Sequence, residues 1–435
     1  MSEWKTVPLY GIATPKSMVN CTERNLLSVY LGKGVVPFAS EGAKRTNVTS
    51  LDLSKYQAVD YGDFVLNNQQ AWRGSVGVSR FSGIVSPAYI VLSLNDSLST
   101  DYANYLFQNR TMVDQYVVCS KGVGSIQRNL YWIYLKRVQI PVPPRTEQDQ
   151  IVRVLDWKVS QINKLINAKK KQIGLLQEQK RAVINNVVTH GLNNDTPMKY
   201  SGVGWLGDVP ANWEIRSLRT ILTPFSEKNH PELPLLSVVR EQGVILRDVD
   251  DKEANHNFIP DDLSGYKRAR RGQFVINKMK AWQGSCGVSQ YDGIVSPAYF
   301  VFDLAFENKE YFHYAIRSRI YTNFFAQYSD GIRVGQWDLS ITKMKSIPFF
   351  IPSAEEQAQI VAYIPVAIEK IEKALSGLEH EVSLLHEYRT RLISDVVTGK
   401  MDVCDVEVPQ YEAVEEAAED EPLDENEESA EGDEE

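Results

Sequence analysis

The chain has 435 residues, enough for roughly three structural units that each bury a core of their own. It contains no apolar run near the roughly 18 residues of a membrane span and no apolar signal core at its start. Its four cysteines lack metal-ligand or paired spacing, so we expect a cytoplasmic protein with reduced thiols. The net charge of −9 combines a body of about +8 with a strongly acidic end. That end holds 17 of the 56 acidic residues and no Lys or Arg, against 47 Lys and Arg in the body.

Residues 1–145 alternate short apolar runs with Gly, Asn and Asp, which predicts strands such as 64–66. Helices are expected around 101–109 and 112–119. This first region is therefore predicted to be a mixed α/β globule. A proline-rich segment at 141–144 marks its end.

A long helix is predicted over 146–192, beginning at the plausible cap Thr146-Glu147 and almost free of Gly and Pro. A second long helix is predicted over 353–401. Both carry a heptad repeat of five positions, namely Leu155, Ile162, Lys169, Leu176 and Val183 in the first and Ile364, Ile371, Leu378, Leu385 and Leu392 in the second. Such a repeat is typical of a coiled-coil seam. Lys169 in that seam is interpreted either as a register-fixing residue or as a side chain that extends its charged end to solvent.

The segment between the first helix and the second globule, residues 193–212, is interpreted as a linker. Its letters Gly202-x-Gly204-x-x-Gly207 match a dinucleotide fingerprint. A phosphate cradle needs a strand before the glycines and a helix after them, and Trp205 and Pro210 do not suit that arrangement. We therefore predict turns here and no cofactor.

The second globule, residues 213–352, repeats the first. Residues 62–91 and 272–301 are identical at 19 of 30 positions, and EQDQIV at 147–152 returns as EQAQIV at 356–361. A duplicated globule and helix favours a pseudo-twofold arrangement with antiparallel helices, although the heptads alone also allow a parallel pair. The fold class we predict is α/β (α+β), with two similar globular domains separated by a long antiparallel two-helix coiled coil. Residues 402–435 are predicted to be an acidic disordered tail.

No motif for covalent chemistry is found. The chain has no P-loop, no G-x-S-x-G elbow and no H-E-x-x-H, and its six histidines are scattered. It also lacks the Asn-Pro-Pro-Tyr or Asp-Pro-Pro-Tyr tetrapeptide suited to methyl transfer to a base. A non-catalytic role, without a cofactor or metal in this chain, is the resulting prediction.

Polar positions that differ between the two copies are the candidate DNA contacts, because such variation on a shared scaffold suits two sites with different preferences. Arg and Lys can donate to the two acceptors of guanine, and Asn and Gln can pair with the major-groove edge of adenine. Arg268, Arg270 and Arg271 are expected to bind phosphates and to set register. For each of these residues, a solvated surface charge is at least as good an interpretation. The full candidate set is Lys44, Arg45, Asn47, Gln70, Arg73, Arg128, Arg247, Arg268, Arg270, Arg271, Lys278, Lys280, Gln283 and Arg333.

The chain closely resembles the specificity subunit of type I DNA restriction-modification systems. The resemblance rests on SGVGWLGDVPANWE at 201–214, GIVSPAY in both copies, IPVPPRTEQDQIV at 140–152 and IPFFIPSAEEQAQIV at 347–361, and on helices that end in VVTHG or VVTGK. It covers nearly the whole chain except the acidic tail. It implies two target recognition domains, each recognising one half of a split, asymmetric DNA sequence, and two long helices that form a spacer.

By the same resemblance, the partners are double-stranded DNA, two modification (methyltransferase) subunits docked on the helices and two restriction (translocase and nuclease) subunits. S-adenosylmethionine, ATP and Mg²⁺ are then expected on those subunits. The chain departs from the pattern in two places. The first copy begins abruptly near Trp4, and the acidic tail is additional, with DNA mimicry, solubility or no function as open interpretations.

Two other classes of function would each account for part of the sequence. A self-sufficient restriction enzyme would need nuclease carboxylates and a methyltransferase core, for which the globules offer no spare length. A coiled-coil scaffold that binds only proteins would leave the duplicated globules with their divergent basic loops unexplained. RNA binding is disfavoured because no aromatic platform of the kind found in RNA-binding sheets is visible.

Overall fold

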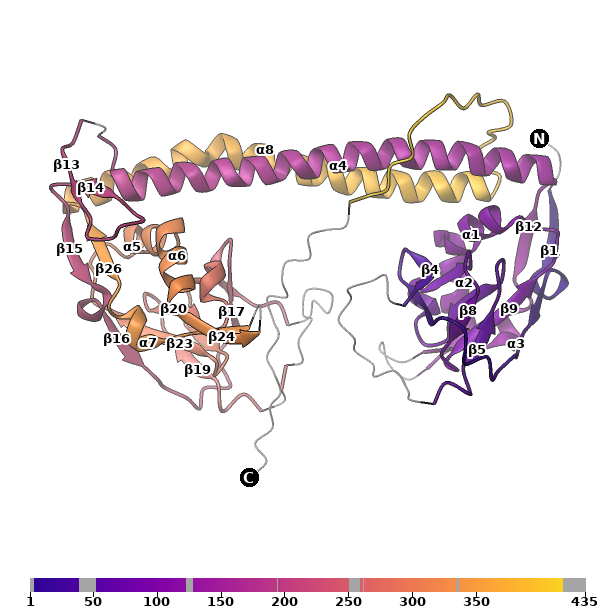
Figure 1. The fold of residues 1–435 in the computed structure, drawn as a ribbon, viewed down its shortest axis with the longest axis horizontal. Coiled ribbons are helices and arrows are strands. Elements are labelled where there is room, and N and C mark those ends of the chain that lie inside the picture. The colour runs from indigo at the N-terminus through magenta and orange to yellow at the C-terminus, as the bar shows by residue number, and fades with distance from the viewer. Residues whose placement is uncertain are drawn as a thin grey trace. The chain divides into compact units, whose positions relative to one another are not determined.

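The structure is a computed structural model, and it describes residues 4–38, 52–122, 128–193, 195–249, 259–260, 262–333 and 336–417. The chain divides into two compact units. The described part of unit 1 lies within Met1–Lys169 and His380–Ala417, and that of unit 2 lies within Lys170–Glu379. Each unit thus combines one globule with parts of both long helices (Figure 1).

In unit 1 the strands are β1 (Lys5–Pro8), β2 (Ala13–Pro15), β3 (Leu27–Tyr30), β4 (Gly34–Pro37), β5 (Gln57–Val59), β6 (Phe64–Asn67), β7 (Val76–Val78), β8 (Gly83–Val85), β9 (Tyr89–Leu94), β10 (Ser120–Lys121), β11 (Asn129–Leu130) and β12 (Gln139–Val142). The helices are η1 (Leu9–Gly11), η2 (Ala71–Arg73), α1 (Thr100–Gln108), α2 (Arg110–Cys119), α3 (Trp132–Leu135) and the first part of α4 (Arg145–His190).

In unit 2 the strands are β13 (Met198–Tyr200), β14 (Asp208–Pro210), β15 (Glu214–Ser217), β16 (Leu222–Phe225), β17 (Leu236–Val239), β18 (Gly243–Leu246), β19 (Lys267–Ala269), β20 (Phe274–Asn277), β21 (Cys286–Val288), β22 (Gly293–Val295), β23 (Tyr299–Leu304), β24 (Ser329–Arg333), β25 (Gln336–Leu339) and β26 (Pro348–Ile351). The helices are η3 (Leu218–Thr220), η4 (Ala281–Gln283), α5 (Lys309–Ile316), α6 (Arg319–Gln327), α7 (Ile341–Met344) and the first part of α8 (Ala354–Val397).

The two globules share one topology, which confirms the duplication. A four-stranded antiparallel sheet has the order β2-β9-β6-β7 in unit 1 and β16-β23-β20-β21 in unit 2. The smaller pairs also correspond, with β1–β12 matching β15–β26 and β5–β8 matching β19–β22. The β13–β14 hairpin belongs to unit 2 and carries the predicted turn: its loop includes Gly202 and Gly207 at positive φ, and Trp205 packs edge-on against Phe324 at 4.9 Å.

The core of each globule is continuous with its helix pair. In unit 1, buried residues of β6, β9 and α1 cluster with Leu155 of α4 and Val396 of α8. In unit 2, the matching cluster includes Val188 near the end of α4 and Ile360 near the start of α8. Helices α1 and α5 lie on the side of their sheets that faces the long helices (Figure 1). Each helix pair therefore serves as one wall of its globule's core.

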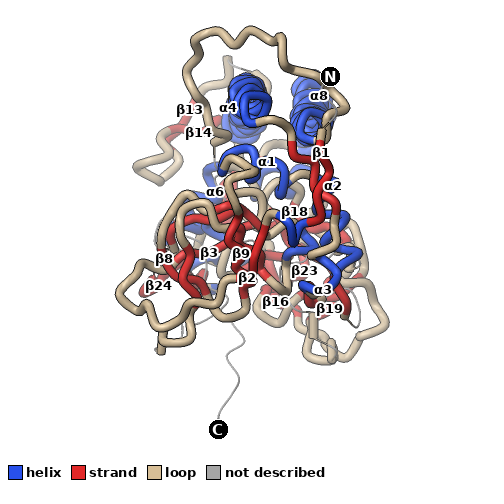
Figure 2. Tube along the Cα trace, turned by 90° about the vertical axis from the view of Figure 1, so that its right-hand side faces the viewer, coloured by secondary structure: helices blue, strands red, loops and turns tan. Residues whose placement is uncertain are grey.

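Helices α4 and α8 pack side by side in antiparallel orientation (Figures 1 and 2). In unit 1, Lys169 forms an ion pair with Glu381 and Asn163 bonds Arg389; in unit 2, Lys180 pairs with Glu372. In these contacts, later residues of α4 meet earlier residues of α8, as an antiparallel pair requires. Among the heptad positions, Leu155, Ile162, Ile364, Ile371 and Leu392 are buried, and Leu176, Val183, Leu378 and Leu385 are partly buried. The predicted antiparallel coiled coil is confirmed. Lys169 lies in the seam, and its charge is paired with the carboxylate of Glu381.

Residues 402–417 differ from the prediction. Composition predicts disorder from Asp402 onward, yet this segment, which we call the strap, packs against the helix pair of unit 1. Val403 is buried in the core of unit 1, and the strap's main chain bonds polar side chains of α4. The acidic composition misleads because valines at 403, 406 and 408 are interspersed with the carboxylates. Residues 418–435 lie outside the described residues. Among the helices of the described part of the chain, none is long and apolar enough to cross a membrane.

Candidate nucleic-acid interface

In unit 1, three of the predicted contact residues gather around Trp72. Trp72 and Arg73 lie on the short helix η2, which ends at Gly74 because that residue adopts a left-handed conformation with φ of 101°. The guanidinium carbon of Arg73 lies 4.8 Å from the centre of the indole ring, and that of Arg128 lies 5.5 Å from it. Gln70 immediately precedes η2. The indole thus holds two cations at one surface.

The arrangement is fixed by main-chain bonds between neighbouring elements. Trp72 Nε1 donates to the carbonyl of Gln69 at 2.9 Å, which sets the orientation of the ring. The amide of Leu130 in β11 donates to both the carbonyl and the side-chain oxygen of Asn68, and this places Arg128 beside η2. A third cation, Lys121 of β10, lies 4.4 Å from the ring centre of Tyr134 and donates to its hydroxyl.

The same corner of unit 2 has a different chemistry. The indole of Trp282 on η4 lies 5.1 Å from that of Trp337 on β25. Lys278 forms an ion pair with Asp338 at 2.8 Å, so its charge is partly neutralised. Lys280 and Gln283 flank the indole and are half-buried. One scaffold therefore presents a stacked pair of arginines in unit 1 and a pair of indoles with a neutralised lysine in unit 2.

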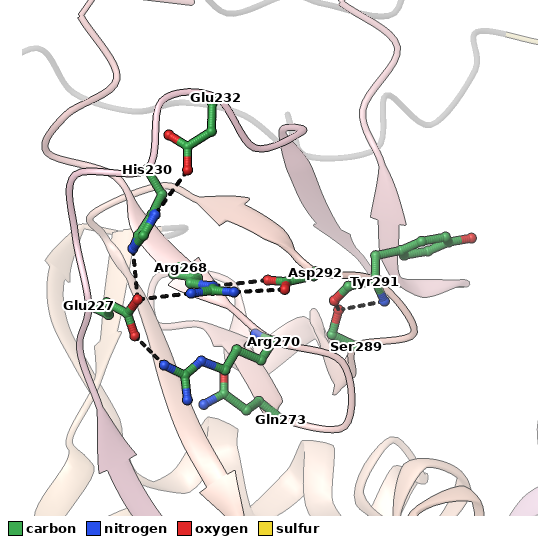
Figure 3. A network of polar contacts seen from close by, with 9 residues as sticks. All are labelled: Glu227, His230, Glu232, Arg268, Arg270, Gln273, Ser289, Tyr291 and Asp292. Atoms are coloured by element: carbon green, nitrogen blue, oxygen red, sulfur yellow. Dashed lines mark hydrogen bonds and ion pairs between the residues drawn. The ribbon is translucent and has the colours of Figure 1, made fainter.

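Two of the three predicted phosphate-binding arginines, Arg268 and Arg270, form an ion-pair network (Figure 3). Arg268 donates two hydrogen bonds to Asp292 and one to Glu227, and Arg270 donates to the second oxygen of Glu227 at 2.5 Å. His230 contacts both Glu227, at 2.7 Å, and Glu232, at 3.0 Å. Arg268 thus has carboxylates on two sides and holds the start of β19 to neighbouring loops. A phosphate contact by Arg268, Arg270 or the exposed Arg271 stays a prediction.

The network shifts the acidities of its members. Hydrogen bonding from Arg268, with further bonds from His230 and Arg270, lowers the pKa of Glu227 to about 2. Bonds to Glu232 and Glu227 raise the pKa of His230 above its ordinary value. The Arg268 guanidinium holds the pKa of Asp292 below its usual range. All these carboxylates are therefore ionised near neutrality, and the network is close to electrically balanced.

The remaining predicted residues are placed less fully. Lys44, Arg45 and Asn47 lie outside the described residues. Arg333 is at the end of β24, where its main chain pairs with Gln336, and Arg247 directly follows β18. The contact of Tyr134 with Lys121 could not be predicted from the sequence, because a tyrosine in a short helix carries no motif of its own.

Two further titratable side chains, Cys286 and His313, are buried in unit 2. Desolvation raises the pKa of the Cys286 thiol to about 12, and burial beside Arg317 lowers the pKa of His313 to about 3. Within the described residues, no three His, Cys, Asp or Glu side chains are grouped so as to hold a metal ion. The aromatic and charged corners at η2 and η4 are surface features that differ between the two globules.

Residues 1–175 match the family model described as Type I restriction modification DNA specificity domain. The MjaVIII specificity subunit of a type I restriction enzyme from Methanocaldococcus jannaschii is 24% identical over 199 residues, which cover 44% of this chain and 43% of that protein. The putative MjaX specificity subunit from the same organism is 25% identical over 177 residues, 38% of this chain and 39% of that protein. The chain thus spans about two fifths of the length of these curated relatives.

One solved structure, from work on complex assembly and conformational transition of the type I R-M system, covers 92% of this chain and 99% of its own with a TM-score of 0.58. Its sequence identity of 13% makes this a likeness of fold. The chain has two copies of one globular domain, each followed by a long helix, and the family model matches the first copy and part of its helix. Residues 1–175, the first globule and part of its helix, are thus similar to the DNA specificity domain of type I restriction-modification systems.

Proposed function

We propose that this chain is the non-catalytic DNA-recognition subunit of a type I restriction-modification complex and binds a bipartite, asymmetric target in double-stranded DNA. Each globule recognises one half-site, and the base pairs between them go unrecognised. The observation that carries this proposal is the contrast at one shared corner: Arg73 and Arg128 on Trp72 in unit 1, and Trp337 and Lys278 near Trp282 in unit 2. Two globules with the same strand order and different polar side chains at one position are suited to recognise two different DNA half-sites.

The chemistry of the corners supports DNA as the ligand. A guanidinium stacked on an indole is held in one orientation, so its outer N–H groups can donate to the two acceptors of guanine in the major groove. The surrounding lysines suit phosphates, which set register but carry no sequence information. Lys44, Arg45, Asn47, Arg247 and Arg333 belong to the same proposal as further DNA contacts.

The helix pair is proposed as the spacer and as the docking surface for two modification subunits, with two restriction subunits joining them. Methyl transfer from S-adenosylmethionine and ATP- and Mg²⁺-dependent translocation and cleavage then take place on those partners. This role places the protein in the cytoplasm with the chromosome. Helices of 46 and 44 residues would each reach about 65–70 Å at ~1.5 Å per residue, long enough to span one or more turns of DNA.

Selection from a random double-stranded DNA library tests the target. The purified chain, alone and with its modification subunits, should enrich a sequence with two defined blocks and an undefined spacer, and binding should weaken steeply with salt. Arg73→Ala should relax selectivity in one block only, by about 1–3 kcal/mol at one base pair. Gln283→Ala, the matched change in unit 2, should affect only the other block. Enrichment of a single uninterrupted block, or no enrichment, would contradict the proposal.

The spacer role is tested separately. Inserting one heptad into α4 and one into α8 at facing positions preserves the seam and lengthens each helix by about 10 Å. The undefined spacer should then grow by about three base pairs at ~3.4 Å each, with both blocks unchanged. A single insertion in α4 alone is the control, because it puts the seam out of register. An unchanged spacer in the double-insertion variant would rule out the helices as the spacer.

A further inference from the structure

The strap, residues 402–417, lies on a row of polar side chains along α4 in unit 1. Ser160, Asn163 and Asn167 recur at helical spacing and so share one face. Ser160 Oγ donates to the carbonyl of Glu412 at 3.1 Å and accepts from the amide of Val414 at 2.9 Å. These contacts go to the main chain of the strap, so they suit an extended peptide of many sequences.

Two asparagines continue the row. Asn163 Nδ2 donates to the carbonyl of Val414 at 3.0 Å, and Asn167 Nδ2 donates to that of Glu415 at 2.9 Å. Asn167 also accepts from the amide of Ala417 at 2.9 Å. An asparagine amide that both donates to and accepts from a neighbouring main chain behaves like one residue of a paired strand. The row therefore acts as a template for a bound peptide.

One side chain of the strap is recognised specifically. Arg389 of α8 donates to Glu416 of the strap at 2.7 Å, and His386 lies 3.5 Å from the other carboxylate oxygen. The side chains of Arg389 and Glu416 are 24% and 22% exposed, so water is partly excluded from the pair. Farther along, Gln150 donates to the carbonyls of Val403 and Val406.

The matching face of unit 2 is built differently. The repeat places Glu369, Glu372 and Ser376 of α8 where α4 has the polar row, and Lys180 where α8 has Arg389. All three are exposed, and Lys180 pairs directly with Glu372 at 2.8 Å. In unit 1 the residue at the position of Glu372 is the neutral Asn163, so Arg389 obtains its carboxylate from the strap. The charge balance between the helices is completed internally in unit 2 and by the strap in unit 1.

We propose that this face of α4 and α8 in unit 1 is a binding groove for an extended acidic peptide, and that the strap is its releasable resident ligand. The groove gives the two otherwise similar helix faces different access. Among the described residues, Glu369, Glu372 and Ser376 on the face in unit 2 are exposed, whereas the strap covers the face in unit 1. The identity of the partner rests on the proposed function: a modification subunit loads first at the exposed face in unit 2 and second at the face under the strap.

A labelled peptide with the sequence of residues 402–417 tests the groove without any partner. Fluorescence anisotropy would compare its binding to the full chain, to a chain ending at Met401, and to the full chain with Glu416→Lys. We expect the shortened chain to bind the peptide at least tenfold more tightly than the full chain, with Glu416→Lys in between. In the shortened chain, Arg389→Ala should weaken binding at least fivefold, and the matched Lys180→Ala should leave it unchanged.

Equal peptide binding by the full and shortened chains, or equal effects of the two substitutions, would overturn the proposal. If the shortened chain fails to fold, the Glu416→Lys chain still decides the question. A peptide affinity equal to that of the unsubstituted full chain would also overturn the proposal. Titration with purified modification subunit then follows loading: strap removal should tighten the second binding step and leave the first unchanged. A subunit that binds none of the chains would contradict the proposed function, while the peptide result still decides the groove.

Discussion

The two globules share one strand order, but the aromatic ring at the centre of the core comes from different sequence positions. In unit 1, Phe64 of the sheet stacks on Phe107 of α1 at 4.1 Å. In unit 2 the matching sheet residue, Phe274, meets Phe312 of α5 edge-on at 5.6 Å, and the position of Phe107 holds Ile316. Phe312 corresponds to Ala103, one helical turn earlier on the same face. The helix can therefore supply the ring from either of two successive turns.

A second ring accompanies the change. Phe349 of β26 packs on Phe312 at 4.9 Å, where unit 1 has the smaller Ile140. Packing density in a core is nearly constant, so a ring gained at one position must be matched by space at another. The comparison indicates that the duplicated core is constrained in total volume and in pattern, and that the placement of individual rings is free to drift.

The largest expected effect comes from removing the shifted ring. Phe312→Ala should lower the free energy of unfolding by about 3–5 kcal/mol, because Phe312 is fully buried and unit 2 has no second ring at the position of Phe107. Urea denaturation of the purified chain measures it. In unit 1, Ala103→Phe alone should destabilise by about 1–3 kcal/mol through overpacking.

The double change Ala103→Phe with Phe107→Ile gives unit 1 the arrangement of unit 2. Its cost should be smaller than the sum of the two single changes, since each relieves the volume error of the other. Strict additivity would show that the two ring positions are independent and would break the comparison.

A feature shared by both units should respond nearly alike in each. Trp4 Nε1 donates to Glu147 at 2.8 Å, and Trp213 Nε1 donates to Glu356 at 3.0 Å. Both bonds tie the strand entering a globule to the first turn of the helix leaving it. Trp213→Phe should cost about 1.5–3 kcal/mol, as expected for a bond to a charged acceptor, and the half-exposed Trp4→Phe somewhat less. A negligible effect at Trp213 would show that the bond does not fasten the junction.

The duplication, the fold class and the antiparallel helices were predictable, because repeated segments and heptads recur at fixed spacing in the sequence. The heptads predict the coiled coil, and the duplication predicts its antiparallel orientation. The stacking of Arg73 and Arg128 on Trp72 was not, since it joins η2 to a strand more than 50 residues away through Asn68. The strap was mispredicted because net charge averages over residues, whereas Val403 and the main-chain bonds to Ser160 act individually. Arg268 illustrates the converse: a basic cluster in sequence was given carboxylate partners by distant segments.

A smaller effect concerns the pH dependence of the ion-pair networks in the two units. The Arg268 network of unit 2 contains His230, where unit 1 has Cys21, and unit 1 has Lys16, Arg24 and Asp60 as its ion-paired residues. Glu227 has its pKa lowered from 4.5 to about 2, so its stabilising contribution is present above pH 4.5 and is lost as pH falls toward 2. His230 has its pKa raised above 6.5, so its contribution is present below pH 6.5 and is lost as pH rises through the folded value.

The Arg268 network of unit 2 should therefore be most stable between pH 4.5 and 6.5. His230→Gln should reduce the thermal midpoint of the chain in that range, and the difference from wild type should disappear at higher pH. Asp60→Asn in unit 1 is the control: it removes an acid whose pKa is lowered by Lys16, so its effect should persist up to neutral pH and shrink only in acid. A pH-independent effect of His230→Gln would mean that the histidine acts through packing and not through its charge.

The smallest expected effect concerns the one charged residue among the ten heptad positions. Lys169 of α4 corresponds to Leu378 of α8, and Lys169 compensates by pairing with Glu381, which is half-exposed. An exposed ion pair contributes about 0–1 kcal/mol, and a leucine in a partly buried seam position contributes about as much through apolar burial. Lys169→Leu should thus change the free energy of unfolding by less than about 1 kcal/mol while making the two seams alike.

The same substitution should also affect the oligomeric state. Lys169 is the only charged residue at the two matching seam positions, so it distinguishes one seam from the other. Its replacement should promote dimers in which α4 of one chain pairs with α8 of a second chain, and sedimentation velocity would detect them. A purely monomeric Lys169→Leu chain would show that the globules, and not the lysine, keep each helix on its own partner.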